Sequence, residues 1–290
     1  MNYKTLLLLS GALASAHVLS DGNQISVAKT AEAASWKIDF FDDFNSFNPQ
    51  NWQDQLLWVN AEDQCYVRDG QHNTREVSNG TLKLRVVDLG AKQPCDNVSK
   101  TGEQKPDTQY VAGRITSKNR QEFSKGKWTA RLKVENSGQP GMFPAWWLLG
   151  ARNNEPPVQE ADENICWPMT GSGEIDIFEH HSDGGPDHYA ARVIKSLGHC
   201  GGGDWQGHML VQEASLDQFH EYSAEWLGDD MIFRLDDLEV YRLVDWSEKL
   251  AEPMFAVLNF AKINDSAMGS NWTMEVDWVR HEYLASSAQP

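Results

Sequence analysis

Short apolar segments separated by polar, glycine-containing turns fill the chain between residues 36 and 282. Residues 81–86 show the pattern clearly: Leu82, Leu84 and Val86 alternate with other residues, so a strand here would turn its apolar side chains to one face. The segments that we expect as strands on this basis are 37–44, 80–87, 113–117, 127–134, 143–149, 174–179, 188–195, 220–226, 232–235, 240–243, 254–260 and 273–282.

Turn sequences and the scarcity of helical patterns favour an all-β fold. Gly228-Asp229-Asp230 and Asp236-Asp237 each stand between two apolar runs, where hairpin turns are expected. No stretch of about 12 residues has a helical stripe, and only 208–219 suggests a short turn of helix. Many strands without intervening helices predict a β-sandwich jelly roll. About 250 residues suit one such domain, which we expect at 36–290.

The N-terminus has the order of a secretory signal. Lys4 is followed by the apolar run 5–14 and then by a small-residue Ala-Ser-Ala sequence. We therefore expect a signal peptide at 1–16, a polar linker at 17–35, and a protein that is secreted or periplasmic. The apolar run is shorter than the roughly 20 residues of a spanning helix, which argues against a membrane anchor.

Four cysteines show none of the Cys-x-x-Cys spacings of zinc or thioredoxin-type sites. In an oxidising compartment an even number suggests two disulfides, for which three pairings exist. We favour Cys65–Cys95 with Cys166–Cys200, because these pairs close the shorter loops. Buried free thiols are the alternative.

The composition is acidic and rich in tryptophan. A net charge of −17, a pI near 4.8 and 12 Trp residues exclude a disordered acidic chain, which would be poor in large aromatic rings. The chain has 25 basic residues against 42 acidic ones, which disfavours a nucleic acid or an anionic membrane as partner, because both require a basic surface.

One expected strand, within 173–181, carries three acids. Glu174 and Asp176 are two residues apart and share a face, whereas Glu179 lies three residues beyond Asp176 and would face the other way. A single-residue bulge at Ile177-Phe178 would return Glu179 to the face of Glu174. The alternative is a solvated edge strand with an alternating acidic face.

Three acids on one face suggest a specific chemistry. With the bulge, the Cα atoms of the two Glu residues lie about 13 Å apart, and side chains that lean inward bring the carboxyls toward ~5–5.5 Å. A retaining glycosidase requires that separation, with one carboxylate attacking the sugar and the other group protonating the leaving oxygen. Asp176 between them would orient Glu174 and, through its charge, raise the pKa of Glu179.

This strand resembles family 16 of the glycoside hydrolases, the laminarinase, lichenase and agarase group, whose signature is E-x-D-x-x-E. The resemblance implies a jelly roll with a concave substrate cleft, in which Glu174 is the nucleophile, Asp176 the assisting residue and Glu179 the acid/base. It extends over roughly 36–284, and further blocks in the family's order are 113–118, 126–133, 143–150, 257–261 and 276–280.

Aromatic residues are the expected sugar-binding surface, since their faces pack against the apolar C–H faces of neutral sugars. Trp147 is the strongest candidate, and its neighbour Trp146 should point into the core. By resemblance, the substrate-binding residues are Asn60, Arg114, Trp147, His199 and Asn259. Rings that could line the rim of the cleft or pack in the core are Trp58, Trp128, Trp167 and Trp205.

The sequence also departs from the family around the expected cleft. Many glucanases of the family carry a His on the strand after the catalytic one, and here His199 is the residue assigned to that role. Residues 262–265 replace the usual Gly-Gly-x-Trp, and 151–170 form a long loop. These changes affect the choice of substrate rather than the chemistry.

A structural calcium ion is a further implication of the resemblance, although the chemistry requires no cofactor. Asp277, with carbonyl groups near Asp43 and Gly80, occupies the positions that hold calcium in family members, and hard oxygen ligands suit that ion. A zinc site at His180-His181 is disfavoured, because adjacent strand residues face opposite ways.

These features predict a secreted, monomeric, retaining endo-glycosidase that cleaves a β-linked polysaccharide. A β-1,3-glucan of the laminarin type is the first choice, because an acidic protein repels heavily sulfated galactans. The alternatives are a hydrolase of agar-type or β-galactan chains and a non-catalytic β-glucan-binding lectin on the same fold. The intact set of Glu174, Asp176 and Glu179 argues against the lectin.

Overall fold

The computed structural model describes residues 35–58, 62–95, 97–99, 107–153, 167–181, 185–199, 202–211, 215–246, 250, 252–263 and 267–285. The expected signal peptide at 1–16 and residues 17–34 of the expected linker lie outside these ranges. The first strand, β1 (Ser35–Asp42), begins at the last linker residue. Among the described residues, no helix is both long and apolar enough to cross a membrane.

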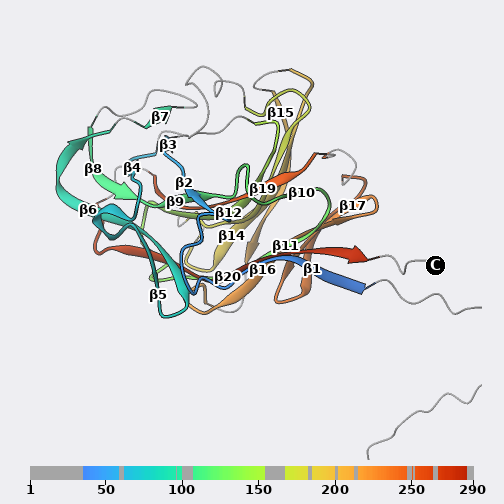
Figure 1. Cartoon of the computed structure of the whole chain (residues 1–290). Helices are drawn as coiled ribbons and strands as arrows, with labels where there is room; N and C mark the ends of the chain where they lie inside the picture. Colours follow the sequence, from blue (N-terminus) through green and yellow to red (C-terminus); the bar gives the residue numbers. More distant parts are fainter. Residues whose placement is uncertain are drawn as a thin grey trace, which may run out of the picture. The chain divides into compact units, whose positions relative to one another are not determined.

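Two large sheets contain most of the described chain (Figure 1). In the first, β1 pairs with β20, and β5 (Arg75–Ser78) pairs with β6. Its main order is β18 (Leu238–Leu243), β17 (Asp230–Leu235), β16 (His220–Leu227), β11 (Gly126–Val134), β20 (Trp272–Ala285), β6 (Thr81–Pro94), β8 (Asp107–Ala112) and β4 (Cys65–Tyr66).

The second sheet carries the residues of the expected active site, and β10 (Glu122–Phe123) pairs with its strand β19. Its order is β15 (Gly203–Val211), β14 (His188–Ser196), β13 (Gly173–Glu179), β12 (Met142–Gly150), β19 (Met254–Lys262), β9 (Arg114–Thr116) and β2 (Gln53–Asp54). The other described elements are the parallel pair β3 (Leu57–Trp58) and β7 (Val98–Ser99) and the 3-10 turn η1 (Gln71–Asn73).

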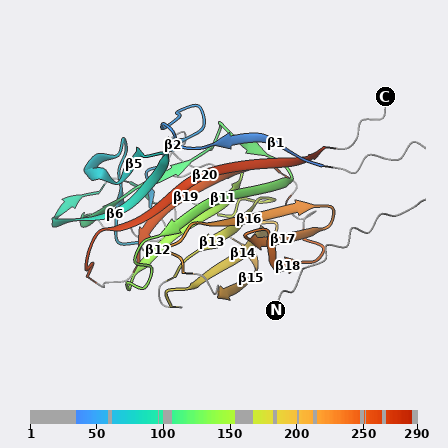
Figure 2. The same cartoon turned by 90° about the horizontal axis from the view of Figure 1, so that it is seen from below.

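The apolar core lies between the two sheets. Leu82 and Trp128 from the first sheet are fully buried in one cluster with Trp146, Ile175 and Leu258 from the second. Alternate residues of each strand point into this layer, because side chains of a strand alternate between its faces. Figure 2 shows the neighbouring strands β20, β11, β16 and β17 of the first sheet side by side. The predicted all-β jelly roll is confirmed.

Each of the predicted strand segments overlaps a strand of the structure, but weakly patterned strands were missed. The expectation of a helical turn within 208–219 is wrong for 208–211, because these residues belong to β15 and pair with β14. Trp205 and Met209 on β15 are exposed, so this strand is held by backbone hydrogen bonds and shows little apolar alternation. The strands without a predicted counterpart are β2, β3, β4, β5, β7, β8, β10 and β15.

The predicted hairpin turns are present. Asp236 and Asp237 join β17 to β18 with φ angles of 48° and 64°. Two consecutive left-handed residues are what a type I′ turn requires, and Asp accepts this conformation more readily than most residues. Gly228, with φ of 60°, and Asp229 join β16 to β17.

The predicted disulfide between Cys65 and Cys95 is present and ties β4 to the residue that follows β6. The two cysteines are 30 residues apart in sequence. Closing a loop of that length stabilises a fold by about 3.6 kcal/mol, mainly by restricting the unfolded chain. Cys166 and Cys200 lie outside the described residues, so the second pair stays a prediction.

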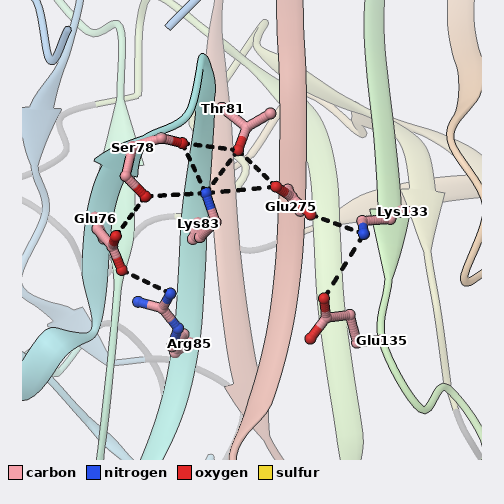
Figure 3. A network of polar contacts seen from close by, with 8 residues as sticks. All are labelled: Glu76, Ser78, Thr81, Lys83, Arg85, Lys133, Glu135 and Glu275. Carbon is pink, nitrogen blue, oxygen red and sulfur yellow. Dashed lines mark hydrogen bonds and ion pairs between the residues drawn. The ribbon is translucent and has the colours of Figure 1, made fainter. Parts of the chain in front are cut away.

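A network of polar contacts crosses β5, β6, β20 and β11 on the face of the first sheet that points away from the core (Figure 3). Lys83 Nζ lies 2.8 Å from the Ser78 carbonyl oxygen and 3.4 Å from Glu275 Oε1. Glu275 also accepts a hydrogen bond of 2.6 Å from Thr81 and lies 2.8 Å from Lys133 Nζ. Burial raises the pKa of Glu275, but the hydrogen bonds from Lys133 and Thr81 outweigh burial and lower it.

Glu275→Gln is expected to lower the free energy of unfolding by about 1–2 kcal/mol at pH 7, because the charge-assisted contacts to Lys83 and Lys133 are lost. The Glu275 carboxyl has a lower pKa in the folded than in the unfolded protein, so this stability is present at neutral pH and disappears as the carboxyl is protonated in acid. Urea unfolding at pH 7, and again near pH 4, measures the difference. Glu135→Gln is the control, since Glu135 is more exposed and lies 3.7 Å from Lys133. Equal losses in the two variants would contradict this expectation.

Candidate active site

The strands β12, β13, β14 and β15 bring side chains together by register. Residues that pair directly across antiparallel strands point to the same side of the sheet. Leu149, Glu174, Ile194 and Trp205 pair in this way and form one row. Ile175, the next residue after Glu174, points into the core. The row therefore lies on the opposite face of the second sheet, called the site face below.

Further rows on the site face contain the other two acids. One row joins Val257, Trp147, Asp176, Arg192 and Gly207, and the next joins Arg114, Asn259, Ala145, Glu179, Ala190 and Met209. Between Asp176 and Glu179 the register shifts against both neighbouring strands, which is the bulge that the odd spacing predicted. The bulge puts Glu174, Asp176 and Glu179 on one face.

Glu174 is held by a tryptophan. Its Oε2 accepts a hydrogen bond of 2.9 Å from Trp167 Nε1, and the residue is 8% exposed. The Trp167 ring packs edge to face on Trp205, with ring centroids 5.5 Å apart, and Trp205 is 51% exposed. These two rings form an aromatic wall beside Glu174. Both had been expected either to line the rim of the cleft or to pack in the core.

Asp176 lies between the two glutamates and is 2% exposed. Burial raises its pKa well above the usual value, and the charges of Glu179 and Glu174 raise it further. A side-chain hydrogen bond with Glu174 adds to this effect. Burial and these charges favour the protonated form of Asp176, so the carboxylate whose charge raises the pKa of Glu179 is Glu174 rather than, as expected, Asp176.

Glu179 combines burial with a neighbouring cation. Its pKa is raised to about 7, because the upward effects of burial and of the Glu174 charge outweigh the downward effect of the Arg192 guanidinium. Arg192 Nη1 donates a hydrogen bond of 2.6 Å to Glu179 Oε2. A carboxyl with this pKa can carry a proton at neutral pH and also release it, which suits a general acid/base.

Arg192 is the site residue that sequence reasoning missed. It stands on β14 in the row of Asp176, beside Glu179. The signal was an Arg in the otherwise apolar segment 189–194, at a position whose face could be assigned only once the register of β14 was known.

Trp147 is fixed by two polar residues that were expected to bind substrate. Its Nε1 donates a hydrogen bond of 2.8 Å to Asn259 Oδ1, and the Arg114 guanidinium carbon lies 5.1 Å from a ring centroid of Trp147. Arg114 is 1% exposed and donates to Gln55 Oε1 over 2.5 Å, while Asn259 Nδ2 donates to Tyr66 Oη over 3.3 Å. Asn259 thus fixes the edge of the Trp147 ring, and Arg114 packs over its face. Their direct contact with a sugar stays a prediction.

Other predicted aromatic and substrate-binding residues have different outcomes. Asn60 and the side chain of Trp58 lie outside the described part of the chain. His199 is exposed in the turn after β14, with its ring against Gly202, and its role in substrate binding stays a prediction. Trp128 is not a rim residue: it is fully buried between the sheets, because its position on β11 faces inward.

The expected calcium ligands meet near one point of the first sheet. The pairing of β20 with both β1 and β6 brings Asp277 next to the ends of these strands, where Asp43 and Gly80 lie. The Asp277 carboxylate forms an ion pair with Arg131. A guanidinium at this point opposes a divalent cation, so calcium would have to displace Arg131, and the residues fit the ion poorly. A structural calcium stays a prediction, and no chemical step depends on it.

The geometry places a hydrogen-bonded carboxylate, a buried acid and a carboxyl with a pKa near 7 in neighbouring rows, beside aromatic rings. Known proteins are similar to this chain in sequence and in fold. The Beta-glucanase of Rhodothermus marinus is 26% identical over 260 residues, which cover 87% of this chain and 78% of that protein. The Glucan endo-1,3-beta-glucosidase of Cryptopygus antarcticus is 28% identical over 216 residues, which cover 71% and 68%.

A solved structure and a family model agree with these relatives. The crystal structure of LamAcat from Zobellia galactanivorans matches with a TM-score of 0.68 and 27% identity, covering 85% of this chain and 97% of that one. The model of "Glycosyl hydrolases family 16" matches residues 54–283, a range that includes all three carboxylates of the site face. The chain belongs to glycosyl hydrolase family 16.

Proposed function

We propose that this glycoside hydrolase is an endo-acting, retaining enzyme of β-1,3-glucan. The observation that supports the proposal most is the placement of Glu174, Asp176 and Glu179 on one face of the sheet, with the pKa of Glu179 raised to about 7. The names of the two relatives, a β-glucanase and an endo-1,3-β-glucosidase, support β-glucan as the substrate.

In this proposal Glu174 is the nucleophile. Its ionised carboxylate attacks the anomeric carbon while the bond to the glycosidic oxygen breaks, and Glu179 gives its proton to that leaving oxygen. Glu179, now ionised, takes a proton from a water molecule whose oxygen attacks the anomeric carbon and releases Glu174. Two inversions leave the sugar in its original β configuration.

Asp176 has a supporting part. Because burial and the two neighbouring carboxyls raise its pKa, Asp176 stays protonated and adds no third negative charge. Its hydrogen bond with Glu174 fixes that carboxylate in one orientation. The second fixed point is the Trp167 indole, which donates to Glu174 Oε2. A nucleophile held from two sides needs little reorganisation during attack.

Reducing-end release from laminarin, lichenan, agarose, carrageenan and β-galactan tests the proposed substrate. The fastest release is expected from laminarin, with attack inside the chain producing oligosaccharides of mixed length. Hydrolysis of agarose or β-galactan without hydrolysis of laminarin would show that the substrate is a galactan and not a β-glucan. Binding of laminarin without turnover of any of the polymers would identify the chain as a lectin.

The activity is expected to fall as the pH rises above about 7. Glu179 must be protonated to act as the acid, and its pKa is raised to about 7. Above that pKa, kcat/KM on laminarin should fall about tenfold for each pH unit. Initial rates in buffers of constant ionic strength measure this limb. A rate that remains constant up to about pH 9 would contradict the assignment of Glu179.

We also propose that the protein is exported and that residues 1–16 are removed. The basic, apolar and small-residue order of the N-terminus and the Cys65–Cys95 disulfide support this proposal. Mass spectrometry of the protein recovered from the medium or periplasm of an expressing bacterium tests it. Recovery of the full-length chain from the cytoplasm alone would contradict export.

A further inference from the structure

The Arg192 guanidinium forms an ion pair with the carboxyl of Glu179, the acid/base of the proposed function. Its Nη1 lies 2.6 Å from Glu179 Oε2. The side chains of Glu179 and Arg192 are 12% and 31% exposed, so the ion pair is partly shielded from water. Shielded ion pairs hold their geometry better than pairs on the open surface.

Gly207 makes room for this arginine. It stands opposite Arg192 on the neighbouring strand β15. A Cβ atom at position 207 would lie 2.4 Å from Arg192 Cγ, 2.8 Å from the Ala191 carbonyl oxygen and 3.0 Å from Arg192 Cβ, and the first two distances are closer than a side-chain carbon approaches such atoms. Glycine therefore lets the Arg192 stem lie across the strand, and a larger residue would push the stem away.

We propose that Arg192, seated on Gly207, is a positioning residue that holds the Glu179 carboxyl toward the glycosidic oxygen. The inference rests on the acid/base role of Glu179 in the proposed function. The guanidinium binds Oε2 and leaves Oε1 to carry the proton that is transferred. A carboxyl fixed at one oxygen presents the other in a defined direction, which favours proton transfer.

The positive charge of Arg192 also limits how tightly Glu179 holds its proton. Burial raises the pKa of Glu179, Arg192 lowers it and Glu174 raises it. The other titratable neighbours are Asp176 on the same strand and His181 just beyond its end, whereas β12 on the other side has no titratable residue. Burial and Glu174 both raise the pKa of Glu179. Without Arg192 nothing in this set would lower it, so the pKa of Glu179 would rise.

The pH dependence of kcat/KM for laminarin separates this role from a merely structural one. Arg192→Met keeps much of the stem and removes the charge; we expect the basic limb to move up by about 1 pH unit and kcat to fall about tenfold. Arg192→Lys keeps the charge and loses the planar fork, so the limb should stay within about half a pH unit while kcat remains reduced. Lys195→Met is the matched control: Lys195 is a cation of the same strand that pairs with Asp204 at 3.3 Å, and neither quantity should change.

Gly207→Ala tests whether the space at Gly207 is needed to position the Arg192 side chain. In the wild-type background it is expected to displace Arg192 and to move the basic limb in the same direction as Arg192→Met. In an Arg192→Ala background the contact with Cγ is absent and the contact with the Ala191 carbonyl oxygen remains, so Gly207→Ala should no longer move the basic limb, and any remaining loss of activity measures its effect on β15. This double-mutant cycle removes any effect of Gly207→Ala on β15 itself, because that effect is common to both backgrounds.

The outcomes separate the inference from the function on which it rests. A basic limb that stays in place in Arg192→Met and Gly207→Ala, with thermal unfolding as in wild type, would overturn the role of Arg192. If Arg192→Met does not fold, Arg192→Lys and Gly207→Ala in the wild-type background still decide the question: an unreduced kcat in the first and an unmoved basic limb in the second would overturn the role of Arg192. Full activity in Glu179→Ala would instead overturn the acid/base role of Glu179.

Discussion

Glu174→Gln is expected to reduce laminarin hydrolysis about 10,000-fold or more, because the amide cannot form the glycosyl-enzyme intermediate. The substitution keeps the size of the side chain and one oxygen that can accept the Trp167 hydrogen bond, so binding of laminarin should persist. Reducing-sugar assays and affinity electrophoresis on laminarin gels measure the two properties. Glu239→Gln, on β18 of the other sheet, is the control and should leave both unchanged. Undiminished hydrolysis by Glu174→Gln would remove Glu174 from the mechanism.

Chemical rescue identifies the role of Glu174 as well as its importance. In Glu174→Gly, azide can occupy the space of the missing carboxylate and attack an aryl β-glucoside or laminaribioside that has a good leaving group. One displacement inverts the anomeric carbon, so the expected product is the α-glycosyl azide. A β-glycosyl azide would show that the removed group was not the nucleophile.

Glu179→Ala is expected to lower kcat/KM on laminarin by about 100-fold to 10,000-fold, the contribution that a positioned acid/base makes. A dinitrophenyl glycoside needs no proton for its departure, so the glycosyl-enzyme should still form quickly and then accumulate. The basic limb of the pH profile, which follows the pKa of about 7 at Glu179, should disappear in this variant. Azide should rescue turnover with the opposite stereochemistry, a β-glycosyl azide, because it attacks the intermediate held by Glu174. Equal losses on laminarin and on the activated substrate would contradict this role.

Much of the fold could be predicted because the buried strands have a clear pattern of apolar residues in the sequence. In β6, Leu82, Leu84 and Val86 alternate with other residues, β20 alternates in the same way from Trp272, and the long apolar segment of β19 follows from its burial. Strands such as β2 and β10 contain two residues and have no period to detect. β15 exposes Trp205 and Met209, so its pairing with β14 depends on backbone hydrogen bonds that leave little trace in the sequence.

The site was predictable where the spacing along one strand decides the geometry. The interval between Glu174, Asp176 and Glu179 required a bulge, and the register shows one there. Residues brought in by other strands could not be placed this way. Arg192 reaches Glu179 only because β14 pairs with β13 in a particular register, and Gly207 matters only because β15 pairs with β14.

The extent to which a side chain is buried accounts for the remaining differences between the predicted and the observed positions of site residues. Trp128 stands on a strand of alternating pattern and Trp147 on a continuously apolar strand, and neither pattern says which sheet will carry the ring. Trp128 lies in the core, whereas Trp147 lies on the site face and is held by Asn259. Arg114 is buried beside Trp147, where aromatic faces and Gln55 stabilise its charge, and its expected contact with substrate stays a prediction.

The configuration of the first product tests the two-carboxylate mechanism most directly. Proton NMR recorded during the first minutes of laminarin hydrolysis, before the anomers equilibrate, shows which reducing end the enzyme releases. Attack by Glu174 followed by Glu179-assisted attack of water requires the β anomer to appear first and the α anomer to grow in later by mutarotation. Release of the α anomer first would show a single displacement and would contradict the assignment of Glu174 as nucleophile.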